Sequence, residues 1–509
     1  METSPFPLAA SPYPAATLTT RSLLTSSLSF PMKNLDKTRE LRGSNRSSDG
    51  ISRLGGDSLD RPGLSAFAWI AAPLRASKSA IAGRFSGGVS LGFRKILENL
   101  SWLMFDRLVR MGMGLLVGVW VARYLGPAQF GSLNFAISFV ALFGSLATLG
   151  MDTIVVREIV CNSEGVHEIL GTTMALRGGA AILTSLVTIA SIRLIQPHDR
   201  EALLLVGILS VGSIFQAVDT IDLFFQSQVK SKISVWSKNS AFLVFAAVRI
   251  ALIHFRATLW PFAVAGAGEV VLGACGLIAG YHFSGEKFRS WRSRGHRAVE
   301  LLKQSWPAIF SGVAIMIYMR IDMVMLKMMR GDVAAGLYAA ATRVSEVWYF
   351  IPVAIVSSVS PSIMRVKNNP ELFYGRLRKL FFLMTWISVG IGSTVALLSN
   401  FIVKHLYSVA YIAAAPVLAV HIWASVFVFL GVAQMPWDTS QNLLKLSLYR
   451  TAAGAVINVA MNIVLIPRYS AMGAAIATVV AYAISAVIAN AFSARTRVIF
   501  LMQIKSFLP

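Results

Sequence analysis

Two charged residues, Arg320 and Asp322, lie within a strongly apolar stretch, IYMRIDMVMLKMM, at residues 317–329. Inside a membrane a charge is costly, so it usually has a partner or a function. An arginine suits phosphate because its planar fork forms bidentate, charge-assisted hydrogen bonds and stays protonated. Two positions apart, the two side chains point to different faces of a helix. We expect Arg320 to line a cavity for an anionic head group, or to form an ion pair with a neighbouring helix, and Asp322 to pair across helices.

Three further arginines in apolar segments could line the same cavity. Arg110 lies near the middle of its segment, although Asp106 at i−4 could neutralise it. Arg343 lies at a depth similar to that of Arg320, but Glu346 at i+3 offers a local partner. Arg249 lies near the end of its segment, where its long side chain could simply snorkel to the interface.

Four carboxylates are candidates for coupling or gating: Glu269, Asp219, Asp222 and Asp322. Glu269 lies about 16 Å into its segment at 1.5 Å per residue. A lone carboxylate at that depth can be protonated when it is desolvated, which makes Glu269 a candidate for proton coupling. The alternative is a neutral, hydrogen-bonded structural residue. Asp219 and Asp222 lie near the end of another segment, where gating or structural hydrogen bonding is expected.

Prolines within apolar segments remove helical hydrogen bonds and can produce kinks. Such kinks could act as hinges in a conformational change. The candidates are Pro307, Pro352 and Pro416.

The chemistry-bearing residues show no arrangement typical of an enzyme or a metal site. There is no phosphate-binding loop, no nucleotide-binding cassette and no Ser/His/Asp constellation. The seven histidines are scattered without ligand spacing, and the two cysteines, Cys161 and Cys275, indicate neither a disulfide framework nor a metal site. We therefore expect no catalytic residues, no metal and no cofactor.

The elements that position these residues are expected to be membrane-spanning helices. The chain has 509 residues, of which 55% are hydrophobic and only 14% charged, and its mean hydropathy is +0.63. Soluble domains are about a quarter charged. Apolar runs of about 20 residues, each long enough to cross a bilayer, recur along the chain. We predict twelve spans, at 100–122, 131–151, 171–195, 202–225, 234–254, 258–283, 301–327, 334–358, 379–402, 411–434, 446–466 and 471–493.

The distribution of lysine and arginine predicts the orientation. One set of connections carries twenty of these residues and the opposite set carries eight. Basic residues are typical of cytoplasmic loops, so both termini are predicted to be cytoplasmic. This placement also explains the net charge of +23 without a nucleic acid partner. The outer set comprises Arg123, Arg193, Arg200, Arg256, Lys327, Arg330, Lys404 and Arg468.

The longest inner connection divides the chain into six spans plus six. We predict an N-terminal lobe at 98–283, a cytoplasmic linker at 284–300, a C-terminal lobe at 301–495 and a cytoplasmic tail at 496–509. Residues 1–97 are rich in Ser, Arg, Gly and Pro and are expected to be a disordered basic tail. A mis-called start upstream of Met32 is an alternative, and a Ser/Thr-rich targeting segment is another.

An internal repeat supports the six-plus-six division. LGPAQFGSLNFA at 125–136 and RGDVAAGLYAAA at 330–341 each follow the first span of their half. A shift of 205 residues superposes Gly126 on Gly331 and Gly131 on Gly336. Because each half has an even number of spans, the two halves would be related by an axis along the membrane normal.

Several motifs resemble a known transporter family. VARYLGPAQFGSLNFAISFVALFGSLATLGMDTIVVREI at 121–159 is similar to the N-terminal signature of the polysaccharide-biosynthesis flippases. These proteins belong to the multidrug/oligosaccharidyl-lipid/polysaccharide exporter superfamily. DTIDLFFQSQ at 219–228 resembles the family's D-W-x-F-Q element, with Leu223 in place of the usual Trp, and 320–365 resembles its seventh and eighth spans. The resemblance covers about residues 98–495.

The resemblance implies an all-α fold of two six-helix lobes around a central cavity. It implies a bacterial plasma-membrane flippase that moves a polyprenyl-pyrophosphate-linked oligosaccharide to the outer leaflet for surface polysaccharides such as O-antigen, lipopolysaccharide or exopolysaccharide. The implied partners are that lipid-linked substrate, the bilayer and other polysaccharide-assembly membrane proteins. The alternatives are a multidrug exporter, a lipid II flippase of the same superfamily, or a membrane glycan polymerase.

Overall fold

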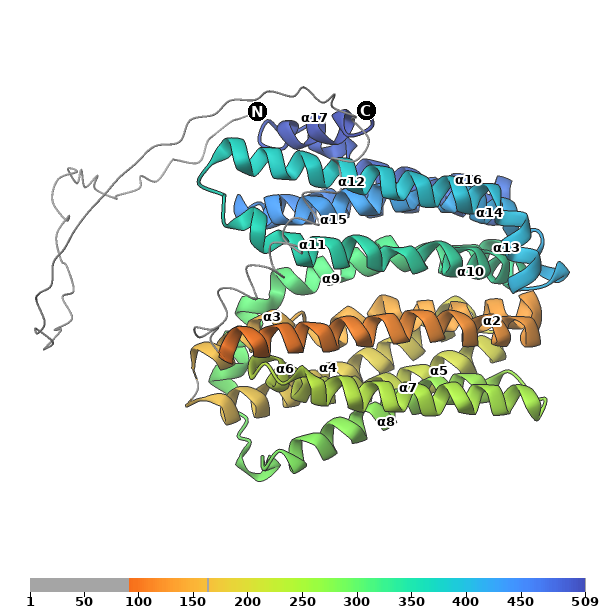
Figure 1. Ribbon diagram of the computed structural model, residues 1–509. Helices are drawn as coiled ribbons and strands as arrows, with labels where there is room; N and C mark the ends of the chain where they lie inside the picture. The colour runs from red at the N-terminus through yellow and green to blue at the C-terminus, as the bar shows by residue number, and fades with distance from the viewer. Residues whose placement is uncertain (1–90, 163, 509) are drawn as a thin grey trace, which may run out of the picture. The chain divides into compact units, whose positions relative to one another are not determined.

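The protein is built from helices that are long enough to cross a membrane. The computed structural model describes residues 91–162 and 164–508, with side chains from Arg110 onward apart from Leu444. Every regular element in these ranges is a helix (Figure 1). Ten stretches among the described residues are long and apolar enough to span a membrane, and two of them, at 110–161 and 445–491, each overlap two predicted spans. The predicted all-α polytopic class with about twelve spans is confirmed.

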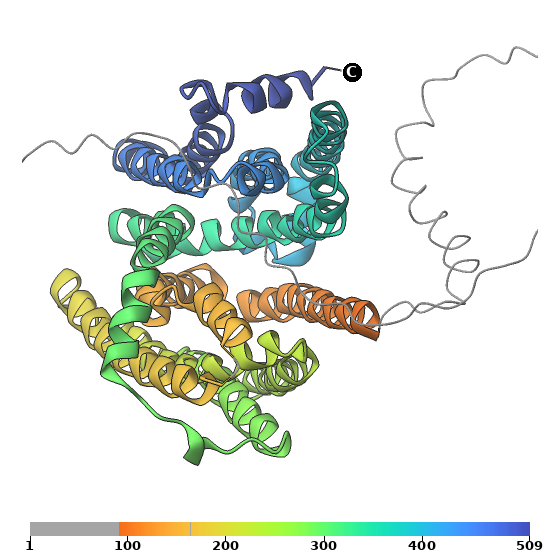
Figure 2. The same cartoon turned by 90° about the vertical axis from the view of Figure 1, so that its left-hand side faces the viewer.

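We call α2–α8 the N lobe and α9–α17 the C lobe, and Figures 1 and 2 show the two groups as neighbouring layers. The N lobe comprises α2 (Leu91–Thr148), α3 (Asp152–Cys161), α4 (Val166–Ile195), α5 (Arg200–Ile214), η1 (Phe215–Asp219), α6 (Thr220–Ser227), α7 (Ser231–His254) and α8 (Trp260–Phe283). The linker contains η2 (Phe288–Ser290). The C lobe comprises α9 (Gly295–Arg330), α10 (Asp332–Glu346), η3 (Val347–Tyr349), α11 (Phe350–Met364), α12 (Pro370–Leu397), α13 (Ser399–Leu406), η4 (Val409–Tyr411), α14 (Ala414–His421), α15 (Ala424–Ser440), α16 (Leu444–Ala486), η5 (Ile488–Ala491) and α17 (Arg497–Lys505).

The two hairpin glycines of the internal repeat adopt the same backbone conformation. Gly126 has φ 69° and ψ 173°, and Gly331 has φ 84° and ψ −178°. A positive φ is accessible to glycine at little cost, which explains glycine at both turns. The end of the bundle that carries these two turns is called the hairpin end, and it is the predicted outer side.

The repeated hairpins also pack against each other. A Cβ on Gly131 would lie 1.9 Å from the carbonyl oxygen of Asp332, and a Cβ on Gly336 would lie 1.8 Å from the carbonyl oxygen of Pro127. Pro127 and Asp332 are themselves equivalent positions, 205 residues apart. The contact is therefore reciprocal, as a two-fold relation between lobes requires. The lobes approach through backbone at both glycines.

Polar contacts reinforce the closed hairpin end. The Lys327 ammonium lies 3.0 Å from Asp199 of the N lobe and 2.9 Å from Asp332. The Arg123 side chain of the N lobe donates to the Leu406 carbonyl at 2.5 Å. Burial opposes ionisation of Asp199, but hydrogen bonds from the Ala202 amide and Lys327 hold the pKa of Asp199 below its usual value. The Lys327–Asp199 pair is thus present at neutral pH and weakens only as the pH falls through that lowered pKa.

The segments beside the lobes pack against them or extend their helices. Residues 91–97, expected in the N-terminal tail, form the first turns of α2, while residues 1–90 lie outside the described part. The linker packs on the N lobe, where the Arg292 amide donates to the His167 carbonyl at 3.2 Å. The expected C-terminal tail contains α17, whose fully buried Gln503 bonds to Gln434 at 3.3 Å. A local hydrophobicity pattern does not reveal such docking.

The three hinge candidates occupy different positions. Pro307 lies inside α9. Pro352 lies in the first turn of α11, directly after the 3₁₀ segment that interrupts the eighth span. Pro416 lies in the first turn of the short α14. Pro352 thus lies at an interruption within the span Asp332–Met364, and Pro416 lies where a proline costs no helical hydrogen bond. A hinge role for the three prolines stays a prediction. The fourth span is interrupted by η1 without any proline.

Candidate functional site: a cavity between the lobes

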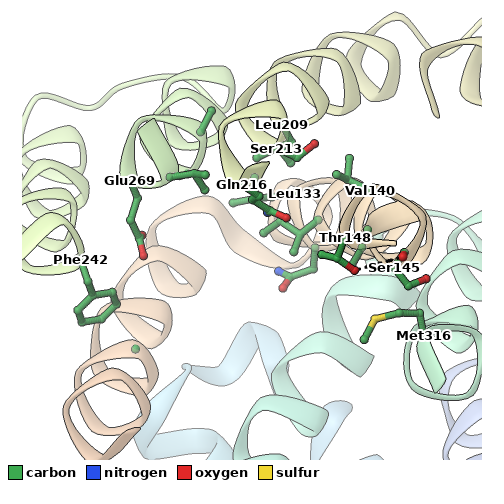
Figure 3. Close-up of a pocket in the computed structure, with 18 of the residues that line it drawn as sticks. Leu133, Val140, Ser145, Thr148, Leu209, Ser213, Gln216, Phe242, Glu269 and Met316 are labelled. Carbon is green, nitrogen blue, oxygen red and sulfur yellow. Dashed lines mark hydrogen bonds between the residues drawn. The ribbon is translucent and has the colours of Figure 1, made fainter. Parts of the chain in front are cut away.

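A cavity of about 910 Å³ lies between the lobes. Its wall comes from α2, α5, α7 and α8 of the N lobe and from α9 and α10 of the C lobe. It reaches Val121 and Phe130, on either side of the Gly126 kink, so the contacts at the hairpin end close it on that side. In Figure 3, Phe242 and Glu269 extend toward α2 on one side, and Thr148 and Met316 lie on the other.

The N-lobe wall carries a cluster of charges. The Arg249 guanidinium lies 2.9 Å from the Glu269 carboxylate, and the Arg110 guanidinium lies 3.9 Å from it. The Arg110 guanidinium also lies 5.7 Å from the centre of the Phe242 ring. The description of Glu269 as a lone carboxylate is wrong here, because Arg249 is its partner. Of the two expectations for Arg249, the structure shows the place in the cavity wall rather than at the interface.

Arg343 of the C lobe extends toward the N lobe. Its guanidinium lies 5.6 Å from the Phe130 ring of α2. A Cβ on Gly118 would lie 2.0 Å from Nη1 of Arg343, so the missing side chain leaves room for the guanidinium. Among the described side chains no carboxylate lies within 4 Å of Arg343, and Glu346, its expected local partner, acts on it only from a longer distance while facing Arg320 at 4.0 Å.

Arg320 lies beside the large cavity rather than in its wall. It lines a small pocket of about 20 Å³, together with Asp322, Glu346 and His421. Its side chain remains 40% exposed. One helical turn earlier on α9, Met316 lies in the wall of the large cavity. Of the two expectations for Arg320, the contact with Glu346 is present, and a role in substrate binding stays a prediction.

Replacing Gly118 with alanine is expected to displace the Arg343 guanidinium without unfolding the protein, because the clashing atoms end a flexible side chain. Loss of a charge-assisted contact costs about 1.5–3 kcal/mol. We expect a 10- to 100-fold fall in substrate affinity, measured by direct binding. Gly114→Ala is the matched control, since its Cβ meets nothing within 4 Å in the same cavity. If Gly118→Ala lowers affinity equally in an Arg343→Gln background, the two residues are not coupled as argued.

A polar side pocket of about 240 Å³ adjoins the cavity and shares Gln216 and Glu269 with it. Lys238 of α7 lies there, 2.9 Å from Asp219 and 2.8 Å from Asp222. Both carboxylates at the end of the fourth span thus share one ammonium group. Structural pairing, one of the two expected roles, is observed, and a gating role stays a prediction.

Asp322 is the hub of a buried polar cluster in the C lobe. It is only 3% exposed. Its carboxylate accepts hydrogen bonds from Tyr338 at 3.0 Å and Asn462 at 2.5 Å, and Thr478 Oγ1 lies 2.5 Å from it. Asp322 therefore does pair across helices, as expected. Its partners are hydrogen-bonding side chains of α10 and α16, not a residue of opposite charge.

The Asp322 cluster carries oxygen atoms of the kind that bind small cations. No group of three or more His, Cys, Asp or Glu suited to a metal occurs among the described side chains. The Asp322 cluster instead offers carboxylate, amide and hydroxyl oxygens, which hard cations prefer. Asn462 Oδ1 is buried there without a hydrogen-bond partner. The adjoining pocket of about 20 Å³ is large enough for one water-sized occupant.

Some charged residues at the cavity were not singled out from the sequence. Arg177, 1% exposed, lies 2.5 Å from Asp152, which lines the cavity. The sequence could have indicated Arg177, because it is an arginine six residues inside the predicted span 171–195. Lys327 was counted as a loop residue, yet it is 5% exposed and sits in the interlobe contact. A basic residue at the end of a span does not by itself reveal whether it faces solvent or a second lobe.

Comparison with solved structures places this architecture in a known class. The structure of "Lipid II flippase MurJ, inward closed conformation" is 16% identical, with a TM-score of 0.61, over 81% of this chain and 91% of that chain. An inward-facing multidrug resistance MATE family transporter of the MOP superfamily is 14% identical, with a TM-score of 0.62, over 79% of this chain and 98% of that chain. A MOP superfamily transporter from Pyrococcus furiosus is 15% identical, with a TM-score of 0.55, over 81% of this chain and 95% of that chain. The fold is therefore that of the multidrug/oligosaccharidyl-lipid/polysaccharide exporter superfamily.

Sequence comparison narrows the class to a family. The family described as polysaccharide biosynthesis protein matches residues 96–367, more than half of the chain. The chain belongs to this polysaccharide biosynthesis protein family. A search of curated protein sequences finds no match.

Proposed function

We propose that the protein is a flippase that moves a polyprenyl-pyrophosphate-linked oligosaccharide from the cytoplasmic to the outer leaflet of a bacterial plasma membrane. Alternating access of the central cavity carries the head group, and the product serves surface polysaccharide biosynthesis. The observation that carries this proposal is the presence of Arg249 and Arg343 in one cavity wall, from opposite lobes.

The charge of the cavity fits a pyrophosphate better than a cationic drug. Arg249 and Arg343 line the cavity itself, and Arg110 lies in the adjoining polar pocket. One carboxylate, Glu269, faces two of these three arginines. The other carboxylates at the cavity and its side pocket are held by other cations, Asp152 by Arg177 and both Asp219 and Asp222 by Lys238. Arg343 is then the surplus cation, since it has no carboxylate within 4 Å among the described side chains, and a surplus positive charge attracts an anion and repels a cation. The apolar remainder of the wall can accommodate sugar faces and lipid.

Transport against a gradient needs a coupled energy source, and the Asp322 cluster supplies a site for one. We propose that Asp322 binds a small cation, sodium or a proton, in the C lobe. Tyr338, Asn462 and Thr478 converge on it from two helices, so occupancy can alter how α9, α10 and α16 pack. A ligand shifts a conformational equilibrium only by binding the two states differently.

The test is reconstitution in liposomes with a fluorescent undecaprenyl-pyrophosphate oligosaccharide, read as head-group accessibility in each leaflet. We expect protein-dependent translocation that falls about 10- to 100-fold in Arg343→Gln and Arg249→Gln, the loss expected for a charge-assisted contact. Arg193→Gln, an exposed arginine outside the cavity, is the control. Equal translocation rates in all three variants would show that the cavity arginines do not bind the substrate.

Parallel substrates separate the alternatives. A lipid II analogue, a cationic drug and the oligosaccharide lipid are compared in the same vesicles, each with imposed sodium and proton gradients. Transport of the drug alone would indicate a multidrug exporter. Transport of lipid II in preference to longer oligosaccharides would indicate a lipid II flippase. Glycan chain growth without transbilayer movement would indicate a polymerase and overturn the proposal.

A further inference from the structure

A second, strongly apolar hollow of about 1110 Å³ lies on the N lobe, between α5 and α8. Its α5 wall consists of residues three or four apart from Arg200 to Phe215, which is one face of the helix. Phe245 of α7 forms part of the other side. Apart from Arg200 and Cys275, the residues that line this groove are aliphatic, aromatic or glycine.

The groove is shaped for a long, flexible chain. From Arg200 of α5 to Phe215 of η1 it extends over 15 residue steps, about 22 Å at 1.5 Å per residue, compared with a hydrocarbon core of about 30 Å. Its volume exceeds the range of about 300–1,000 Å³ typical of compact small-molecule sites. Gly207 leaves part of the groove open, since a Cβ on it would meet nothing within 4 Å. Leu204 and Val211 of its wall are 50% and 53% exposed, so the groove is open along the side predicted to face lipid.

One end of the groove adjoins the head-group site. Phe215 borders both the groove and the polar side pocket that contains Arg110 and Lys238. That side pocket shares Gln216 and Glu269 with the central cavity. In this pocket Lys238 is paired with Asp219 and Asp222, and Arg110 lies 3.9 Å from Glu269, so a pyrophosphate would take these cations in competition with the carboxylates. A lipid with its pyrophosphate held there could pass its chain around Phe215 into the groove. The 3₁₀ segment η1 begins at this residue.

The other end of the groove also carries a cation. Arg200 lies at the predicted outer end, and its guanidinium forms no ion pair among the described residues. The neighbouring Asp199 is already held by Lys327 at 3.0 Å. A guanidinium beside an apolar channel suits a phosphate attached to a hydrocarbon chain. The groove thus joins a cationic group at the inner side to another at the outer side.

We propose that this groove holds the polyisoprenoid chain of the lipid-linked substrate while its pyrophosphate moves from the polar side pocket to the outer side near Arg200. The inference rests on the proposed function and deepens it by naming the site for the lipid part. The chain remains in a defined path on the N lobe instead of exchanging freely with bulk lipid.

The experiment uses the full-length protein in liposomes and a polyprenyl pyrophosphate with a photoreactive diazirine in its chain. We expect cross-links concentrated on the groove faces of α5 and α8 and displaced by excess undecaprenyl phosphate. Gly207→Phe fills the groove and is expected to lower this labelling at least tenfold. Gly179→Phe is the control, because Gly179 is exposed on α4, meets nothing within 4 Å and lies outside the groove.

Binding and transport readouts separate the two proposals. Gly207→Phe should also slow translocation of a long-chain substrate while leaving a three-isoprene analogue unaffected. Labelling spread evenly over the lipid-facing helices, or unchanged in Gly207→Phe, would overturn the inference and assign the groove to bulk lipid. Groove labelling that is displaced by undecaprenyl phosphate, without translocation of any substrate, would uphold the lipid site and overturn the flippase.

Discussion

Gly336→Ala is expected to force the hairpin end open and to reduce transport about 10- to 100-fold. The new Cβ would lie 1.8 Å from the Pro127 carbonyl oxygen, which is a backbone atom of the opposite lobe. No side-chain rotation relieves that contact, so the lobes must separate. Overpacking a close contact costs about 1–3 kcal/mol, and each 1.4 kcal/mol is a factor of ten in a population.

The two-fold relation predicts the same result for the equivalent glycine. In Gly131→Ala, the Cβ would lie 1.9 Å from the Asp332 carbonyl oxygen. Gly144→Ala is the matched control, since Gly144 lines the cavity on the same helix and its Cβ meets nothing within 4 Å. If only one of the two hairpin glycines mattered, the reciprocal packing would not be the element that closes this end.

Spin labels report the opening directly. Cys161 and Cys275 are first replaced by serine, and labels are attached at Arg256→Cys in the N lobe and Lys404→Cys in the C lobe, both exposed near the hairpin end. A longer mean distance in Gly336→Ala than in the wild type is expected. An unchanged distance together with unchanged transport would show that this contact is not part of the conformational cycle.

The spans and the repeat were predictable because their signals are local. Apolar runs set the helices, and glycine at matching positions marked the two turns, where Gly126 and Gly331 indeed have positive φ. The resemblance to polysaccharide-biosynthesis flippases is confirmed by the family match. What the repeat did not reveal is that the hairpins touch each other, because a shift between two segments carries no information about their distance in space.

The cavity could be predicted in character but not in detail. Spacing along a helix gave the depth of each charge, but it could not identify the adjacent helix. Arg343 therefore had Glu346 as its expected partner, whereas the structure gives it Phe130 of the opposite lobe. Asp322 was correctly expected to pair across helices, but its partners could not be identified, because Asn462 and Thr478 lie 140 and 156 residues away along the chain. Only the packing of α16 against α9 brings them together.

Asp322→Ala is expected to abolish ion-coupled transport and to destabilise the C lobe. The substitution removes the acceptor for the buried Tyr338 hydroxyl and the Asn462 amide. Each buried donor left without a partner costs about 1–3 kcal/mol, so the protein should unfold at a lower temperature than the wild type. Asp322→Asn retains the volume and one acceptor oxygen, which separates loss of the charge from loss of packing.

The decisive measurement is the effect of sodium on thermal stability in detergent at constant ionic strength. If a cation binds the folded protein at Asp322, a concentration of 100 times the dissociation constant stabilises the wild type by about 2.7 kcal/mol. Asp322→Asn should lose this stabilisation, and Glu269→Gln should retain it, since Glu269 is occupied by Arg110 and Arg249. If Asp322→Asn retained the stabilisation and Glu269→Gln lost it, the coupling site would be the N-lobe cluster around Glu269. Stabilisation by neither sodium nor a lower pH in the wild type would leave Asp322 as a purely structural hub, because a ligand that does not bind the folded state cannot drive its conformational change.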